Sequence, residues 1–316
     1  QAKIGVGSYE NVGSAYTIAS DDRSAGLKTV SLTATEIEGI ALFDEGSVLT
    51  LRAILTDAAG NSTTGTASAT TITIDQTNPS SFTAGLVTTS GSSVVSGYWN
   101  NVNTALSVRV PLENDQTLIG GNIQVQASIS GGYYTNLDTA LAISTADISS
   151  GFETVSIDSS SLEGITAFAE GEDIFLRSII TDVAGNYTNG NASATTLNID
   201  QTSPTLASVS STAADSTYEI WNEINVTVNF SEVVTLVDGT VIVTLETGDN
   251  DQSVNITSIT SSNSASGTYI VQAGDESSDL MANTVALSSG SILDAAGNTM
   301  TSFSIPNGAN IGDASA

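Results

Sequence analysis

Apolar and polar residues alternate along many short stretches of this chain. Residues Val48–Asp57, Ala69–Asp75, Ile174–Asp182 and Ile224–Phe230 place most of their apolar side chains at every second position. A period of two is that of a β-strand with one buried face. Gly, Asn, Asp and Ser interrupt the pattern at spacings of about 8–12 residues, and no convincing helical stripe outlasts two turns. The alternation predicts an all-β protein built of antiparallel β-sandwiches.

The chain repeats itself. Shifting the sequence by 125 residues aligns residues 26–79 with residues 151–204 without a gap, and 30 of these 54 positions are identical. Asp-x-Ala-Gly-Asn and Asp-Gln-Thr-x-Pro occur in both copies, and a third Asp-Ala-Ala-Gly-Asn lies further on. Such repetition indicates copies of one structural unit along the chain. We expect tandem immunoglobulin-like sandwiches arranged end to end: 1–77, lacking its first strands; 78–202, complete; and 203–316, divergent and lacking its last strand.

Charge narrows the choice of partners. The 34 acidic residues outnumber the six basic ones and give a net charge of −28. Nothing could neutralise phosphate, so we expect no nucleic acid partner, whereas metal cations fit. Cysteine and histidine are absent, which excludes thiolate zinc sites and histidine-based catalytic triads. No apolar run reaches the length of a membrane span, so we expect no membrane insertion.

The repeated aspartates fall where the loops and linkers of neighbouring units should meet. In a seven-strand sandwich the Asp-x-Ala-Gly-Asn loop and the loop after the second strand lie at the pole that receives the preceding linker. Carboxylates that converge there repel one another unless a cation neutralises them. Calcium suits such a place because it takes six to eight oxygen ligands in irregular geometry. The sequence predicts Ca2+ held by Asp75, Asp182, Asn186, Glu113 and Asp115 at one junction, by Asp200, Asp294, Asn298 and Glu232 at the next, with Asp57 as the matching aspartate of the first copy.

Turn chemistry explains the same aspartates without a metal. Asp57 can accept hydrogen bonds from the amides of its own loop, and Asp75 can form an Asx turn before Gln-Thr-x-Pro. Gly60 and Asn61 tolerate positive φ. Both explanations remain open at the level of the sequence.

Several motifs together carry a family resemblance. Asp-x-Ala-Gly-Asn, a Thr-rich loop, a strand and Asp-x-Thr-x-Pro resemble the tandem bacterial immunoglobulin-like repeats of large calcium-binding surface adhesins. "VTVNFSEVV", "VTLETGDND" and "YIVQAGDESSDL" resemble one repeat class of that group. The resemblance covers nearly the whole chain, although its 125-residue repeat exceeds the usual length of about 100. It implies an extracellular stalk that calcium stiffens, with Asp75, Asp182, Asp200 and Asp294 as ligands and Glu113 and Glu232 as further candidates.

Three functions compete. The first is a non-catalytic stalk segment at the bacterial cell surface, whose partners are the neighbouring repeats of the same chain. The second is a subunit of a surface filament or sheath, in which identical chains join by strand exchange at incomplete units. The third is a carbohydrate-binding module; Trp99 and Trp221 could stack on a sugar, but their equivalent positions favour packing. We expect no enzyme, because a carboxylate pair for glycoside hydrolysis should occur once rather than in every copy.

Overall fold

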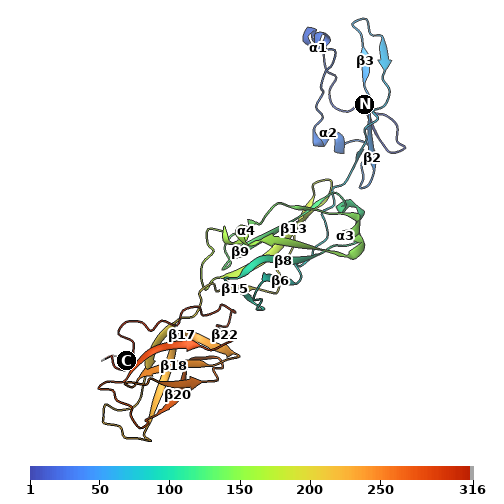
Figure 1. Cartoon of the computed structure of the whole chain (residues 1–316). Helices are drawn as coiled ribbons and strands as arrows, with labels where there is room; N and C mark the ends of the chain where they lie inside the picture. Colours follow the sequence, from blue (N-terminus) through green and yellow to red (C-terminus); the bar gives the residue numbers. More distant parts are fainter. Residues whose placement is uncertain (314–316) are drawn as a thin grey trace. The chain divides into compact units, whose positions relative to one another are not determined.

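The computed structural model describes residues 1–313, and these residues form an all-β protein (Figure 1). They divide into two compact units. The first holds Gln1–Ser80 with the loops Asp115–Asn122 and Ile180–Thr188, and the second holds the rest. None of the helices in the described part is long and apolar enough to cross a membrane. These short helices are α1 (Ser20–Ala25), α2 (Ala34–Glu38), η1 (Gln116–Leu118, a 3-10 turn), α3 (Thr145–Ser150) and α4 (Ser159–Glu163).

The middle segment forms a complete sandwich of two sheets. One sheet has the strand order β12-β8-β6, and the other has the order β10-β9-β13-β15-β7, with β11 on β9 and β14 on β13. One sheet thus groups β6, β8 and β12, and the other groups β9, β13 and β15. This is the grouping of strands in an immunoglobulin sandwich. The expected fold class is confirmed. The strands are β6 (Val87–Gly91), β7 (Tyr98–Trp99), β8 (Asn103–Pro111), β9 (Asn122–Ile129), β10 (Thr135–Asn136), β11 (Leu141–Ala142), β12 (Phe152–Asp158), β13 (Asp173–Thr181), β14 (Tyr187–Asn189) and β15 (Leu197–Ile199).

The third segment is a second sandwich of related order. One sheet holds β16-β17-β20, and the opposing sheet holds β19-β18-β21. The distal half of the long strand β17 pairs with β22 instead of with β16. The expected absence of a last strand concerns residues up to 316 and so lies partly outside the described residues. The strands are β16 (Leu206–Ser210), β17 (Glu223–Val237), β18 (Val241–Glu246), β19 (Gln252–Ile256), β20 (Ser262–Ile270), β21 (Met281–Leu287) and β22 (Ser291–Leu293).

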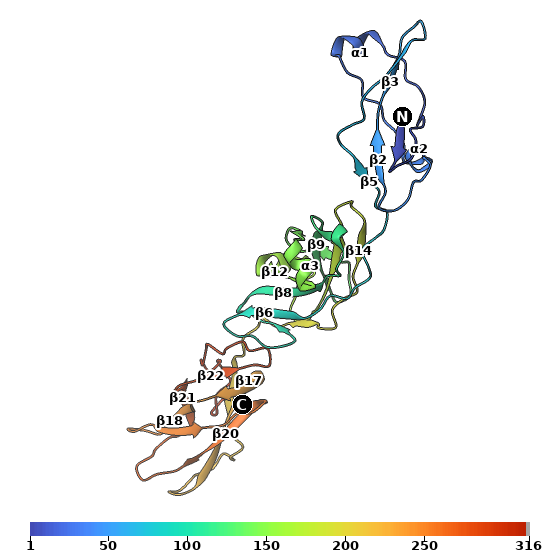
Figure 2. The same ribbon diagram turned by 90° about the vertical axis from the view of Figure 1, so that its right-hand side faces the viewer.

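The first segment keeps only part of this architecture (Figure 2). Its small sheet has the order β1-β2-β5, and β3 and β4 form a separate hairpin. The 125-residue shift places each of its helices and strands on a counterpart in the middle sandwich, α1 on α3 and α2 on α4 among them. The division at residues 77 and 202 remains a prediction. The strands are β1 (Ala2–Ile4), β2 (Val48–Leu51), β3 (Ile54–Thr56), β4 (Ser62–Thr64) and β5 (Ile72–Thr73).

One segment breaks the correspondence. Residues 27–33 match β12 under the shift, and "LKTVSLT" has much the same alternation as "FETVSID", yet they adopt no strand. In the middle sandwich β12 pairs along its whole length with β8. The first unit contains no counterpart of β8 among its described residues, so these backbone groups have no strand to pair with. Local alternation alone therefore did not suffice to form this strand.

Candidate metal centre

Each Asp-x-Ala-Gly-Asn loop is closed by its own first and last residues. In Asp57–Asn61, Asp182–Asn186 and Asp294–Asn298 the aspartate accepts a hydrogen bond from the backbone N–H of the asparagine, at 2.8, 2.9 and 2.8 Å. It also accepts one from the asparagine side-chain amide, at 2.9, 2.9 and 2.8 Å. Turn chemistry therefore operates in all three copies. It does not explain what the second and third loops do in addition.

The third loop fits closely against the middle sandwich. Gly297 has a φ of +88°, and a Cβ at this position would lie 2.5 Å from Oγ of Ser93. Only glycine combines this backbone conformation with so close an approach. Beside it, Nδ2 of Asn100 donates to the carbonyl of Ala296 at 2.7 Å. The motif is thus shaped for a protein contact as well as for a turn.

In the second and third loops the asparagine also holds the preceding linker. Asn298 Nδ2 donates to the backbone carbonyl and to Oδ1 of Asp200, at 2.9 and 3.0 Å. Asn186 makes the same pair of contacts with Asp75, at 3.1 and 3.2 Å. Asn61 in the first loop is exposed. The repeated Asp-Gln-Thr-x-Pro and Asp-x-Ala-Gly-Asn motifs are therefore two halves of one contact.

Three carboxylates gather at the third loop. Asp200 follows β15, Glu232 lies within β17, and Asp294 follows β22. One oxygen of each lies within 4.8 Å of the others, and it is the one such group found among residues 1–313. Asp294 is buried and the other two are half-buried. The arrangement brings together three of the residues that the sequence predicts for this junction.

The electrostatics of the group reflect this crowding. Burial, together with the charges of Asp294 and Glu170, raises the pKa of Asp200 to about 6. Burial and the charges of Asp294, Asp200 and Glu170 also raise the pKa of Glu232. Neighbouring negative charge disfavours the ionised form of each group. A cation placed here would reverse that effect.

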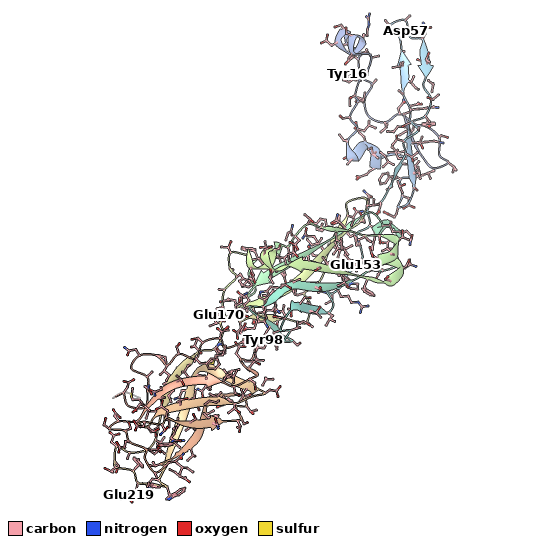
Figure 3. The ribbon with its side chains drawn as sticks, viewed as in Figure 1. Tyr16, Asp57, Tyr98, Glu153, Glu170 and Glu219 are labelled. Carbon is pink, nitrogen blue, oxygen red and sulfur yellow. The ribbon has the colours of Figure 1, made fainter. Side chains whose placement is uncertain are left out.

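Sequence reasoning missed one acidic residue at each junction. Glu170 interacts with Asp200, and its Oε2 accepts from the Gln201 backbone N–H at 3.0 Å. Glu45, its counterpart under the 125-residue shift, accepts from the Gln76 N–H at 2.9 Å and interacts with Asp75. Figure 3 places Glu170 at one end of the middle sandwich. The signal was a repeated Phe-x-Glu-Gly, which aligns within the two copies.

The first junction gathers fewer carboxylates. Burial and the charges of Asp182 and Glu45 raise the pKa of Asp75. Asp115 instead accepts hydrogen bonds from the N–H and the hydroxyl of Thr117, at 2.9 and 2.8 Å, and so begins η1. Glu113 is exposed. Asp75, Asp182 and Asn186 therefore lie in contact within the first unit. A ligand role for Glu113 and Asp115 stays a prediction.

Asp57 differs from its two counterparts. It is exposed at the tip of the β3–β4 hairpin (Figure 3). Hydrogen bonds from Asn61 lower its pKa, whereas burial, together with neighbouring carboxylates, raises the pKa of Asp75 and of Asp200. A lone loop of this sequence is therefore a stable turn. Among the linker and loop aspartates, a raised pKa occurs where a linker aspartate meets such a loop, at Asp75 and at Asp200.

The protein's own cations do little to neutralise these sites. In the described chain one ion pair occurs, between Lys28 and Asp22 at 3.1 Å. Five of the six basic side chains, Lys28 among them, lie over aromatic rings, where cation–π attraction holds them. No basic side chain among residues 1–313 forms an ion pair with a carboxylate of the two junctions. The pairs are Lys3 and Arg52 on Tyr9, Lys28 on Tyr16, Arg109 on Phe152 and Arg177 on Tyr134.

The two tryptophans have different environments. Trp99 is fully buried, and its Nε1–H donates to Glu163 at 3.1 Å. Trp221 is 79% exposed and has a φ of +75°, an unusual conformation for a bulky residue. The packing role expected from their equivalent positions is therefore confirmed for Trp99 and wrong for Trp221.

The comparisons with known proteins find similar solved structures but no sequence family. No known protein family and no curated protein matches the sequence. A structure of a 1.5-MDa bacterial ice-binding adhesin is similar at 20% identity and a TM-score of 0.31, covering 85% of this chain and 75% of that one. The FN1–FN3 domains of chicken CNTN1 are similar at 15% identity and a TM-score of 0.25, covering 81% and 73%. Similarity this low carries no weight for function.

Proposed function

We propose that this chain is a non-catalytic, extracellular stalk segment of a large bacterial surface protein of the adhesin type, with calcium at the contacts between linkers and loops. The observation that carries the proposal is the convergence of Asp200, Glu232 and Asp294 on a contact that Asn298 already closes. The same linker–loop contact recurs at Asp75. A feature that recurs in successive units suits a structural role better than a catalytic one.

The donor set favours calcium over other metals. The junction offers carboxylate oxygens and amide groups, and the chain has neither of the residues that bind zinc most strongly. Magnesium demands near-octahedral geometry and holds its waters tightly, whereas calcium accepts irregular loops. A bound calcium ion would supply positive charge that compensates the mutual repulsion of the three carboxylates.

The protein's own residues define what such binding would accomplish. Asn298 aligns Asp200 with Asp294 through hydrogen bonds to both. Glu232 adds a carboxylate from β17, at the point where this strand changes its neighbour from β16 to β22. Glu170 is the remaining acidic residue that interacts with Asp200. Fixing these groups to one ion would restrict movement of the linker against the loop, which is the property that a stalk requires.

Thermal unfolding of one sample in millimolar calcium and then in excess chelator tests the proposal. A free calcium concentration about a hundredfold above the dissociation constant stabilises the folded state by about 2.7 kcal/mol per site. We expect a large calcium-dependent rise in Tm, and no comparable rise with magnesium. An unchanged Tm would make the repeated aspartates turn residues and would remove the basis for a calcium-stiffened stalk.

Small-angle scattering tests the mechanical part separately. The double change Asp75→Asn with Asp182→Asn should increase bending in calcium, because it removes both carboxylates that Asn186 contacts. Identical scattering curves for the two proteins would count against a stiffening role at the first junction.

A carbohydrate-binding role is the second candidate, and exposed Trp221 is the observation that favours it. Exposed aromatic rings stack on sugar rings, and Trp221 combines 79% exposure with a left-handed backbone conformation, an outlier of the kind that clusters at functional sites. Glycan-array binding that is lost in Trp221→Ala would support this role. An array without signal above background would remove it.

A further inference from the structure

The glutamine of the second Asp-Gln-Thr-x-Pro linker is hydrogen-bonded to the middle sandwich. The backbone N–H of Gln201 donates to Oε2 of Glu170 at 3.0 Å, and its side-chain Nε2 donates to Oε1 of Glu163 at 2.9 Å. The same Oε1 accepts from Nε1 of the buried Trp99 at 3.1 Å. The backbone N–H of Asp200 donates to the carbonyl of Trp99 at 3.0 Å. The linker is therefore held on the middle sandwich by contacts that involve no metal.

The neighbouring aspartate makes its side-chain contacts with the third sandwich. The carbonyl and the carboxylate of Asp200 both accept hydrogen bonds from Asn298, and one carboxylate oxygen lies within 4.8 Å of oxygens of Glu232 and Asp294. Adjacent linker residues thus bind in different directions. Gln201 binds the middle sandwich, and Asp200 binds the loop of the third.

The first linker has the same two glutamine contacts. The backbone N–H of Gln76 donates to Glu45 at 2.9 Å, and its Nε2 donates to Glu38 at 3.4 Å. Glu38 and Glu163 are the last residues of α2 and α4. A carboxylate at the C-terminal end of a helix is unfavourable towards the helix dipole, so the helices themselves gain nothing from these charges. Accepting a hydrogen bond from the linker glutamine explains why a glutamate stands at this place in both copies.

We infer that Gln201 and Gln76 are positioning residues of the two proposed calcium centres, an inference that rests on the proposed function. Each acts through the aspartate before it, Asp200 or Asp75, whose backbone it fixes before an ion binds. Groups that orient a metal ligand from outside the coordination sphere typically contribute about 10- to 100-fold to metal affinity. Gln76 is exposed and its side-chain contact is the longer one, so the effect should be larger at Gln201.

Calcium titration of the full chain by calorimetry tests this role. Gln201→Ala should weaken by about tenfold or more the binding event that Asp294→Asn abolishes, and it should leave the event that depends on Asp182 unchanged. Gln76→Ala is the matched control, because it removes the same atoms from the other linker and should weaken only the event that depends on Asp182. Unchanged affinities in Gln201→Ala would overturn the inference and leave the proposed function standing. A parent protein that binds no calcium would overturn both.

Two substitutions of Glu163 separate hydrogen bonding from charge. Glu163→Gln keeps an oxygen that accepts from Trp99 and Gln201, so its calcium affinity should stay close to that of the parent. Glu163→Ala removes the acceptor and should weaken binding as Gln201→Ala does. Equal losses in the two Glu163 variants would show that the charge itself matters, and would overturn the inference that hydrogen bonds position the linker.

Backbone amide exchange in chelator measures the same contacts without any metal. The amides of Asp200 and Gln201 donate to Trp99 and Glu170, so they should exchange faster in Gln201→Ala than in the parent. Amides of Asn103–Pro111 in β8 should exchange at the parental rate. Equal exchange of the linker amides in the two proteins would overturn the inference. Faster exchange throughout, β8 included, would mean that the side chain supports the whole sandwich instead of positioning the linker, and would also overturn it.

Discussion

Asn298 binds the backbone carbonyl and the carboxylate of Asp200, 98 residues away, with the same side-chain amide that closes its own loop on Asp294. The asparagine is buried and its Oδ1 accepts a further hydrogen bond from the Asn101 N–H at 2.9 Å. One residue thus connects a turn, a linker and the preceding sandwich. Its counterpart Asn61 has the turn contact alone among these.

Removing the asparagine side chain should separate these roles. Asn298→Ala should destabilise the protein by about 2–4 kcal/mol, because buried partners, one of them a carboxylate, lose their donor. Asn61→Ala is the matched control and should cost less than about 1 kcal/mol, since its loop is exposed. Urea unfolding of the two variants and the parent gives both values. Equal costs would show that the linker contact contributes nothing to stability.

Neutralising Glu232 should raise Tm in the absence of calcium and reduce the gain in Tm that calcium provides. Glu232→Gln removes one negative charge from a crowded, half-buried group, so Tm measured in chelator should rise. The same change removes a proposed ligand, so the further rise in Tm on adding calcium should shrink. Differential scanning calorimetry under the two conditions measures both effects.

Glu219→Gln is the control for this comparison. Glu219 is exposed at the end of the third sandwich away from β22 (Figure 3), and its substitution should alter neither Tm. A Glu232→Gln protein that loses stability in chelator would show that the carboxylate is stabilising rather than strained.

The calcium-free protein should become more stable as the pH falls towards 4. The pKa of Asp200 is about 6 in the folded protein against 3.8 for an ordinary aspartate. The folded state therefore binds more protons than the unfolded state between these values, and this contribution to stability is lost as the pH rises through about 6. Melting curves in chelator at pH 5 and pH 7 should show the higher Tm at pH 5.

Calcium should reverse this dependence, since ligand carboxylates must be ionised to bind the ion. In millimolar calcium the advantage of pH 5 should vanish or change sign, because protonation of Asp200 then competes with binding. A pH profile that is the same with and without calcium would separate Asp200 from the ion site.

The sequence was sufficient for those features that depend on local pattern and on repetition. Period-two alternation predicted the strands, and the repeated motifs predicted that Asp200 and Asp294 would meet. Sequence-based prediction failed in two situations. In one, a side chain forms a hydrogen bond within its own loop, and in the other, the structure of a segment depends on a partner distant in the sequence. Asp115 caps its own 3-10 turn through Thr117, so its carboxylate is committed locally. Residues 27–33 have strand alternation but no strand beside them. Glu170 acts from a loop 30 residues before Asp200, and only alignment of the two copies could have drawn attention to it.

The tryptophans show the same limit of sequence spacing. Trp99 and Trp221 share the pattern Trp-Asn-x-x-Asn, but Trp99 is held by Glu163 of α4, and the third sandwich has no helix in its described residues. The Trp-Asn-x-x-Asn spacing recurs in the two copies, but the helix that supplies the hydrogen-bond partner of Trp99 does not.

Iodide quenching of fluorescence should therefore distinguish the two tryptophans. Trp221→Phe should remove the quenchable emission and change stability by less than about 0.5 kcal/mol, as for other exposed positions. Trp99→Phe should leave quenchable emission and cost about 1–3 kcal/mol, because a buried ring and its hydrogen bond are altered. Two equally protected tryptophans would contradict the exposure of Trp221.

The two linker–loop contacts should bind calcium with different affinities. The second brings three carboxylates within 4.8 Å, and Glu170 also interacts with Asp200. The first joins Asp75 with Asp182 and Glu45, and Asp115 is engaged with Thr117. Affinity for calcium rises with the number of charged ligands and with the rigidity of the site.

Isothermal titration of the metal-free chain should resolve a tighter and a weaker event. Asp294→Asn should remove the tighter one and Asp182→Asn the weaker one. Loss of the tighter event in Asp182→Asn would reverse the assignment, and a single event of unit stoichiometry that survives Asp294→Asn would place the ion elsewhere.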